Sequence, residues 1–565
     1  MVLGVDILGM IKKFFNFKTK TVTFAAGILA VSTFLNGFLG LLRDRLLASN
    51  FGAGKALDIY FAAFRIPDFI YGILIAGGII AVFLPVFSEY YGQSKEKGWY
   101  FANIVLNCFL VLLVSLCLIL LIFAPMVVEF IAPGFDKESK ELTVSLTRIM
   151  LLSPIFFVLS SIFSGILHYF NHFLVYSIAP VLYNIGIILG IVAFAPLFGL
   201  RGLAYGVALG ALLYLLIQIP SSVMSGFRYK AVFNFKHEGL KQVIKLLIPR
   251  IIGTAATHLN LIIITAIAST LIPGSIAIFN FSNNIQKFPA ALIGLSFAAA
   301  GFPILARSWV NGQKKEFIGH FFSIFRQTLF LIVPVSIFFF ILRIQGVRLV
   351  LGAGQFSRTD IELTAASVGI FAFSIFTFTL IPLLTRAFFS FQDTKTPVMI
   401  GIASIILNVV LCFLLVGFLE SPNFFQYFLA KVFQLQEVKN IQLLGLPIAL
   451  SLSGIFNFSL LFYLLYKKIR YFSPENSLLL KQEARETYLS TAKMLIASFF
   501  LIIFSCLVIR ISANFLNLQT FLGLFFQIAL SSGAGALVYI IAASLLNSSE
   551  LKTIKSSVLE QFKKI

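Results

Sequence analysis

Charged side chains lie in or beside long apolar stretches in the first part of this chain. Arg43 and Asp44 close the first stretch, Asp58 opens the second, and Arg65 lies inside it. A charge within an apolar helix bundle costs on the order of 2.5 kcal/mol or more, so such charges usually face a cavity, a partner or a substrate. Guanidinium groups match phosphate oxygens bidentately and stay charged in a low dielectric. We therefore predict that Arg43 and Arg65 bind an anionic substrate in a central cavity, ordered by Asp44 and Asp58.

Local ion pairing is the alternative explanation for the second stretch. Arg65 and Asp68 are i,i+3 neighbours that flank Pro67. Two such residues lie on one helical face and can partly neutralise each other. The pair would then serve to pin a helix that Pro67 interrupts, and these residues alone leave both explanations open.

A second polar group lies in the apolar stretch that starts near Ile276. Asn283, Asn284 and Lys287 occur in the run Phe281–Pro289, with Lys287 one turn after the amides. This face would be expensive against lipid, so we predict that it lines water or substrate. The alternative is an amide hydrogen-bond network between helices.

The elements that must position these residues are membrane-spanning helices. The chain has 565 residues, of which 59% are hydrophobic and only 12% charged, which excludes an ordinary soluble domain. About 20 apolar residues in a helix cross a bilayer. We predict an all-α polytopic fold of about fourteen spans: 22–42, 59–86, 101–131, 143–167, 173–198, 202–224, 247–272, 276–305, 321–343, 362–389, 397–418, 443–466, 490–512 and 520–546.

The distribution of lysine and arginine predicts the orientation of these spans. The net charge of +21 would suggest nucleic acid in a soluble protein, but here the cations gather in alternate short loops. We therefore expect no nucleic-acid partner, and we predict that the N- and C-termini are cytoplasmic. The loops and tail expected inside carry Lys12, Lys13, Lys18, Lys20, Lys95, Lys97, Arg228, Lys230, Lys236, Lys241, Lys245, Lys314, Lys315, Lys467, Lys468, Arg470, Lys481, Arg485 and the lysines of the C-terminal tail.

An internal repeat predicts two lobes of parallel orientation. The segment from Pro133 through Glu141 to Asn184 resembles the segment from Gly352 through Glu362 to Asn408, at an offset of about 221 to 224 residues, or six spans. An even number of spans gives both copies the same orientation. We predict lobes at 1–224 and 225–466, followed by a helix pair and a cytoplasmic tail in 467–565.

Several other patterns are weak. His168 and His172 have the i,i+4 spacing of a metal pair, but no carboxylate follows at ligand spacing, so we predict no metal site. No nucleophile, base and acid gather in a loop, so we predict a protein that is not an enzyme. Small residues at 186, 190, 206 and 210 have the i,i+4 spacing that lets two helices approach closely.

Several motifs together resemble the MurJ/MviN family, over roughly residues 22–466. They are Arg43-Asp44, Phe51-Gly52-Ala53-Gly54 with Asp58, Ala63-Phe64-Arg65-Ile66-Pro67-Asp68, Ala132-Pro133-Gly134-Phe135, Ala179-Pro180-Val181-Leu182-Tyr183-Asn184 and Gln392-Asp393-Thr394-Lys395-Thr396-Pro397. The last turn is the most specific of them.

The resemblance implies a lipid II flippase of the multidrug/oligosaccharidyl-lipid/polysaccharide exporter superfamily. Such a protein moves the undecaprenyl-diphosphate-linked peptidoglycan precursor across the bacterial inner membrane, and has fourteen helices in two lobes. By the same resemblance Arg43, Asp44 and Asp58 match functionally important positions, and Arg65 matches a usually basic one. The last two helices would extend a groove for the isoprenoid tail.

This chain departs from the family at several cationic positions. Relatives carry charged residues where it has Gly37, Tyr71, Gly72 and Ala76, and an arginine where it has Asn284. Because Lys287 lies one turn from Asn284, on the same helical face, we hypothesise that Lys287 supplies part of the missing charge.

Other functions remain open at this point. A flippase for another undecaprenyl-linked glycan, such as an O-antigen or teichoic acid unit, and a multidrug antiporter share the fold class. A scaffold for envelope assembly is a third possibility. We expect no cofactor, and a dependence on membrane potential or on a coupling cation is left open, as is the oligomeric state.

Overall fold

The structure is a computed structural model of the chain that describes residues 13–19, 22–73, 78–435, 438 and 441–562. Lys12, Lys20 and Ala76 lie outside the described residues. Within those residues every regular element is a helix, which confirms the all-α prediction. The chain divides into two compact units, residues 1–277 and 278–565.

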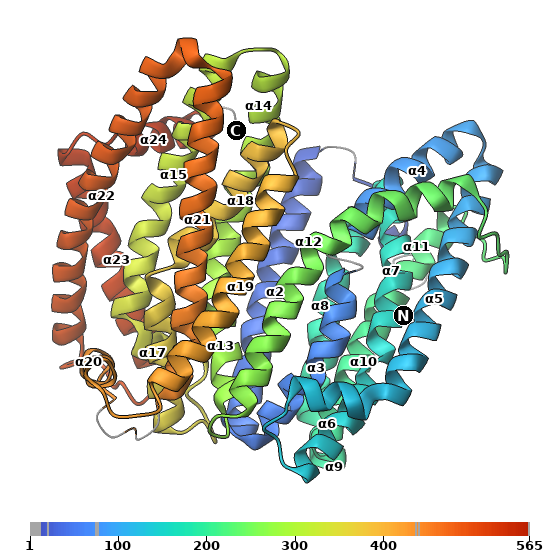
Figure 1. Cartoon of the computed structure of the whole chain (residues 1–565), viewed down its shortest axis with the longest axis horizontal. Helices are drawn as coiled ribbons and strands as arrows, with labels where there is room; N and C mark the ends of the chain where they lie inside the picture. Colours follow the sequence, from blue (N-terminus) through green and yellow to red (C-terminus); the bar gives the residue numbers. More distant parts are fainter. Residues whose placement is uncertain (1–12, 20–21, 74–77, 436–437, 439–440, 563–565) are drawn as a thin grey trace, which may run out of the picture. The chain divides into compact units, whose positions relative to one another are not determined.

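Short turns join many of the helices of the first unit, whereas the longer segment 225–237 joins α11 to α12 (Figure 1). The π-helix η2 continues α8 and holds Gly190–Phe194. The bounds are α2 Val22–Phe51, α3 Lys55–Tyr71, α4 Ile79–Gln93, α5 Lys95–Ile131, α6 Lys137–Met150, α7 Leu152–Tyr169, α8 Phe173–Leu189, α9 Ala195–Phe198, α10 Leu200–Leu216, α11 Gln218–Met224 and α12 Glu238–Ser269.

The second unit holds the remaining helices, of which α13 begins at the end of the first unit. Short elements join the long helices: the π-helix η3 Ala290–Leu295 and the 3₁₀ helices η4 Gln442–Leu444 and η5 Pro474–Asn476. The α-helices are α13 Ser275–Pro289, α14 Ser296–Val310, α15 Lys314–Ile341, α16 Arg343–Val350, α17 Arg358–Ala372, α18 Ile375–Ser390, α19 Lys395–Phe418, α20 Phe424–Phe433, α21 Gly445–Phe472, α22 Ser477–Ser512, α23 Phe521–Leu545 and α24 Ser549–Phe562.

Where the structure describes them, the predicted spans fall largely on helical structure, and many of the helices are long enough to cross a bilayer. Among the described residues, 10 helical segments have both the length and the apolar composition of a membrane span. The number rises to 11 if α17 and α18, which are bent by 45°, form one span. The span predicted at 59–86 is divided between α3 and α4. The count of fourteen stays a prediction.

Glycines set the position of α8 in the first unit. A Cβ on Gly186 would lie 2.2 Å from Gly210 Cα, and one on Gly190 would lie 2.6 Å from Gly206 Cα. The backbones of α8 and of η2, which continues it, therefore touch that of α10, which confirms the predicted close approach. Another face of α8 packs on α2, where the hydroxyls of Ser32 and Ser177 are hydrogen-bonded at 2.9 Å.

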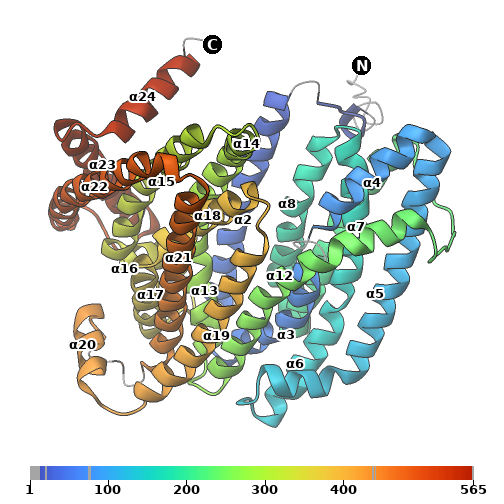
Figure 2. The same cartoon turned by 45° about the horizontal axis from the view of Figure 1, so that its top comes forward.

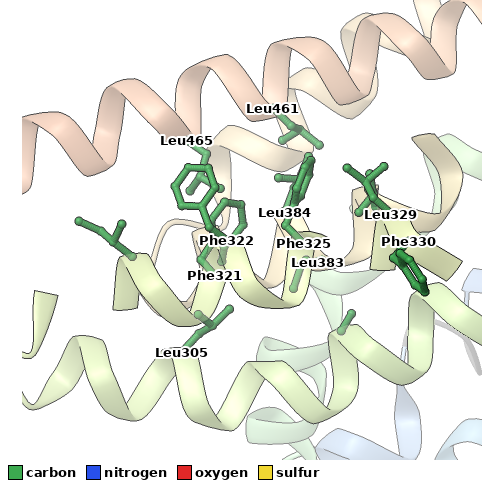
Figure 3. Close-up of a cluster of buried hydrophobic side chains, with 14 of the residues drawn as sticks. Leu305, Phe321, Phe322, Phe325, Leu329, Phe330, Leu383, Leu384, Leu461 and Leu465 are labelled. Atoms are coloured by element: carbon green, nitrogen blue, oxygen red, sulfur yellow. The ribbon is translucent and has the colours of Figure 1, made fainter. Parts of the chain in front are cut away.

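Large apolar side chains form the core of the second unit (Figure 3). Phe321, Phe322 and Phe325 of α15 lie among leucines of α14, α18 and α21, and the three rings are at most 4% exposed. Aromatic side chains bury a large apolar area each, so this cluster fixes α15 against its neighbours. The helices α22 and α23 pack on each other and on α15, as Figures 1 and 2 both show.

The boundary between the compact units lies after residue 277, whereas the predicted lobe boundary lies after residue 224. The helix α12 packs on α3, α4 and α5, so contacts assign residues 238–269 to the first unit. The lobes at 1–224 and 225–466 were instead inferred from the internal repeat, and they stay a prediction.

Candidate functional site in the membrane helices

Arg43 lies near the C-terminal end of α2, within a polar network shared with α8. Its Nε and Nη2 atoms donate to Asp44 Oδ1 at 3.0 and 2.8 Å. Its Nη1 donates to Asn184 Oδ1 at 3.3 Å, and Asn184 in turn donates to Asn36 Oδ1 at 2.8 Å. Both Asp44 and Asn184 are buried. The predicted association of Arg43 with Asp44 is therefore present, and Asn184 is an additional partner.

The Arg43 guanidinium retains capacity to bind an anion. It carries five N–H groups, and three hydrogen bonds reach the described residues. Its side chain is 24% exposed, against 6% for Asp44. Asp44 thus holds one edge of the guanidinium, and the rest of the group remains able to meet a phosphate.

Asp58 lies in the first turn of α3 and contacts the turn that starts α13. Its Oδ2 accepts from the backbone N–H of Gly274 at 2.6 Å, and its Oδ1 accepts from that of Ala277 at 2.8 Å. The carboxylate is 3% exposed. Helix N-termini have unpaired N–H groups and favour negative charge. Both oxygens of Asp58 therefore hold a helix start, whereas its predicted part in substrate binding stays a prediction.

The glycine at position 274 allows the turn before α13 to come close enough to bond Asp58. Its φ is +95°, and a Cβ at this position would lie 2.1 Å from the carbonyl oxygen of Ala53. Only glycine combines that backbone conformation with such a close approach. The Phe51-Gly52-Ala53-Gly54 motif and the start of α13 therefore pack directly on each other.

Arg65 is buried in α3 and faces α12. Its Nε donates to Thr265 Oγ1 at 2.6 Å, and the residue is 8% exposed. On the same pair of helices, Asp68 Oδ2 lies 3.6 Å from His258 Nδ1. Partners on α12 thus engage both members of the predicted Arg65–Asp68 pair. Sequence reasoning missed Thr265, because a lone threonine in an apolar helix carries no signal of its own.

His258 also explains one departure from the family pattern. A Cβ on Gly72 would lie 1.8 Å from His258 Nε2, so the imidazole occupies the space that a side chain at 72 would fill. Tyr71 packs edge-on against Phe157 at 4.7 Å. In this chain the His258 ring and Tyr71 thus lie where the family resemblance implies charged side chains.

The polar residues of α13 in the second unit point in different directions. Asn283 is 3% exposed, and its Oδ1 accepts from Gln286 Nε2 at 3.0 Å. Asn284 is half-buried and Lys287 is exposed. The structure thus separates an inward amide pair from an outward cation, and the predicted substrate contacts of Asn283, Asn284 and Lys287 stay predictions.

The Gln392–Pro397 motif forms a turn between α18 and α19. Asp393 accepts hydrogen bonds from the backbone N–H and the hydroxyl of Thr396, at 3.0 and 2.7 Å, and from Lys468 Nζ of α21. Burial raises the pKa of Asp393, but the bonds from Lys468 and Thr396 outweigh it, so the pKa lies below its usual value. The motif therefore ties three helices together at one end of the second unit.

An apolar pocket of about 710 Å³ opens on the side of the second unit. It lies between α15, the α17–α18 bend and α22. Arg343 is the charged residue of its lining, and the Arg343 guanidinium lies 5.0 Å from the centre of the Phe340 ring. The apolar lining includes Val333, Ile337, Phe340, Phe373, Phe376, Leu495 and Ile502.

Among the described residues, no three His, Cys, Asp or Glu side chains gather where they could hold a metal ion.

Comparison with known proteins relates this geometry to one family. The family model "Lipid II flippase MurJ" matches residues 47–527. A "Probable lipid II flippase MurJ" of Buchnera aphidicola subsp. Schizaphis graminum is 28% identical over 444 residues, covering 78% of this chain and 82% of the relative. That of Haemophilus influenzae is 31% identical over 396 residues, covering 67% and 78%.

Solved structures show the same fold. "Lipid II flippase MurJ, inward closed conformation" superposes with a TM-score of 0.70 at 21% identity, covering 92% of this chain and 98% of that one. An inward-facing multidrug resistance transporter of the MATE family, from the MOP superfamily, has a TM-score of 0.65 at 15% identity, covering 79% and 99%.

Proposed function

The chain belongs to the lipid II flippase MurJ family, a family of multi-pass membrane transporters, and from this we propose that it moves lipid II across the bacterial inner membrane. One observation in the site carries the proposal. Arg43, in a helix that the sequence predicts to cross the membrane, is oriented by Asp44 and Asn184 and keeps N–H groups for an anion. The diphosphate of an undecaprenyl-linked muropeptide is such an anion.

The charge of the headgroup explains why a protein is needed. A diphosphate cannot cross hydrocarbon unaided, because it would lose its hydration without compensation. Cations that line a watery cavity replace that hydration while the lipid tail stays in the bilayer. In our proposal Arg43 contacts the diphosphate, Arg65 adds positive potential from α3, and Asp58 holds the start of α13. Rocking of the two predicted lobes around this site then gives alternating access.

The apolar pocket of the second unit suits the lipid tail. Its lining is aliphatic and aromatic, and α22 provides one wall. We propose that it receives part of the isoprenoid chain, which also explains why helices follow the second predicted lobe. Arg343 is among the lining residues of this pocket, and in our proposal its guanidinium holds a phosphate near the start of the isoprenoid chain.

Membrane potential is the proposed driving force. Each elementary charge that crosses about 100 mV gains or loses about 2.3 kcal/mol, and both the substrate and the site are charged. A coupling cation is the alternative. Lipid II translocation in vesicles with an imposed potential, with and without a sodium or proton gradient, separates the two.

Growth rescue tests the transported lipid. The gene should restore growth to bacteria depleted of their own lipid II flippase, and precursor should accumulate in the inner leaflet without it. Arg43→Gln should abolish rescue at unchanged protein level. Rescue only of an O-antigen or teichoic acid defect, or drug efflux without rescue, would instead support the rival transporters. Full growth rescue by Arg43→Gln would favour a scaffold that does not transport lipid.

The orientation is also a proposal. The excess of lysine and arginine in alternate loops supports cytoplasmic N- and C-termini. Single cysteines placed at Lys95 and at Lys137 should then react with an impermeant thiol reagent from the cytoplasmic and the outer side, respectively.

A further inference from the structure

A pocket of about 520 Å³ lies in the first unit, where α4 ends and α5 begins, and is separate from the site described above. One wall is the first turns of α5. The other is the extended segment that leads into α12, which both Figure 1 and Figure 2 show beside the α4–α5 turn. Its lining is Glu96, Lys97, Trp99, Tyr100, Asn103, Gly226, Arg228 and Lys230.

Two buried asparagines of α5 hold the extended segment in place. Asn103 Nδ2 donates to the carbonyl of Arg228 at 3.0 Å, and its Oδ1 accepts from the N–H of Lys230 at 2.8 Å. One turn further on, Asn107 Nδ2 donates to the carbonyls of Lys230 and Val232, at 2.8 and 3.0 Å. These amides pair with the segment as a neighbouring strand would, so the backbone between Arg228 and Val232 is fixed.

Aromatic packing holds Trp99, one of the lining residues, in place. Phe227 is 3% exposed and packs edge-on against Trp99 at 5.9 Å and Phe163 at 5.4 Å. Trp99 stacks on Phe170 at 5.7 Å, and Lys18 Nζ lies 5.9 Å from the centre of that ring. These contacts hold Trp99, which lines the pocket, and Phe227, which directly precedes Arg228 in the extended segment.

The pocket is positively charged. Lys97, Arg228 and Lys230 contribute three cations, and Glu96 is the single carboxylate in the lining. None of the three cations forms an ion pair within the part of the chain that the structure describes. Lys97 donates to the neutral side chain of Gln93 at 3.2 Å. The site thus attracts an anion.

Its position along α5 is that of a lipid–water boundary. From Phe101 to Val128, α5 contains no charged residue, whereas Lys95, Glu96 and Lys97 precede that stretch. Tyr229, Phe233 and Phe235 lie in the extended segment, which also carries Arg228, Lys230 and Lys236, and they are 60%, 53% and 63% exposed. Exposed aromatic residues beside lysine and arginine are typical of the headgroup region.

We propose that this pocket binds the phosphate headgroup of an anionic phospholipid from the leaflet it faces. Arg228 and Lys230 meet the phosphate from the extended segment, Lys97 meets it from α5, and Tyr229, Phe233 and Phe235 enter the lipid around it. A free phosphate ion offers the same charge, but it has no apolar part that could contact the exposed rings of Tyr229, Phe233 and Phe235. The bound lipid fastens the segment that joins α11 to α12.

Trp99 provides a direct probe, because the chain has only 2 tryptophans. Trp309→Phe leaves Trp99 alone, and phenylalanine maintains the aromatic packing of Trp309 against Phe317 and Phe391. The full-length protein is reconstituted in phosphatidylcholine nanodiscs with increasing phosphatidylglycerol that is brominated near the glycerol end of its acyl chains. We expect Trp99 fluorescence to be quenched at a lower mole fraction than with phosphatidylcholine carrying the same brominated chains.

Charge variants test the residues. Arg228→Gln with Lys230→Gln should weaken the preference for phosphatidylglycerol by roughly thirtyfold, which at about 1.4 kcal/mol per factor of ten is about 2 kcal/mol, the contribution of two cations near a lipid surface. Glu96→Gln should strengthen the preference, which no misfolding would imitate. The matched control is Lys481→Gln with Arg485→Gln, two exposed residues of α22, and it should change nothing.

Three results would overturn the proposal: equal quenching by the two lipids, an equal loss in the control pair, or complete reversal by millimolar inorganic phosphate, which would show a soluble-ion site. The experiment contains no lipid II, so its result is independent of the proposed transport activity.

Discussion

The carboxylate of Asp58 accepts a hydrogen bond of 2.6 Å from the backbone N–H of Gly274. These residues are 216 positions apart, and the bond joins the start of α3 to the start of α13. A charged side chain that looks like a substrate contact in the sequence thus has both oxygens committed to a helix terminus. Loss of the Asp58 carboxylate should therefore lower the stability of the fold before it affects substrate binding.

Asp58→Ala should therefore lower thermal stability in detergent. The variant leaves two buried N–H groups without an acceptor, which costs about 1–3 kcal/mol for each group. Asp58→Asn should cost less, because an amide oxygen still accepts one bond. Glu138→Ala is the control, since Glu138 also lies in the first turn of a helix but is exposed. If Asp58→Ala keeps wild-type stability and loses only transport, Asp58 does not serve to hold the start of α13.

Thr265→Val should impair transport through Arg65. Valine has the shape of threonine but accepts no hydrogen bond, so the buried Nε of Arg65 loses its partner on α12. The loss of a hydrogen bond to a charged group is worth about 1.5–3 kcal/mol. Lipid II translocation at matched protein level should fall for Thr265→Val and recover for Thr265→Ser. Thr257→Val, at an exposed position of the same helix, should behave like wild type.

Gly72→Ala should destabilise the first unit, because the new methyl group would overlap the His258 ring. Overpacking of this kind typically costs about 1–3 kcal/mol. The double variant Gly72→Ala with His258→Ala should recover much of that loss, since the two sites share one volume. Strictly additive effects on melting temperature would show that the ring moves aside freely.

Lys468→Gln should weaken the pH dependence of stability that Asp393 contributes. The pKa of Asp393 is lowered in the fold, so its stabilisation is present above the unfolded pKa of about 3.9 and is lost as pH falls through the folded value. Melting temperatures of wild type and Lys468→Gln should therefore differ most near neutral pH and converge on acidification. A constant difference would place the effect of Lys468 elsewhere, for instance in its contact with Phe388 and Phe391.

Lys287→Gln should reduce growth rescue if Lys287 supplies charge that relatives obtain from an arginine. Lys287 is exposed on α13, whereas Asn283 turns inward to Gln286. Lys287→Arg should retain activity, and Lys315→Gln, an exposed cation at the start of α15, serves as the control. Intact rescue by Lys287→Gln would remove Lys287 from the site.

The sequence by itself determined the helical class, the approximate spans, the close approach of α8 and α10, and the family. Each of these depends on hydropathy, glycine spacing or local motifs, which act over a few turns of one helix. Only the tertiary structure decided that Asp58 holds the turn before α13, that Arg65 meets Thr265 at a separation of 200 residues, and that His258 fills the space beside Gly72. Such partners depend on which helices pack together and at what register, and a single side chain in an apolar helix does not encode the identity of the residue it will face.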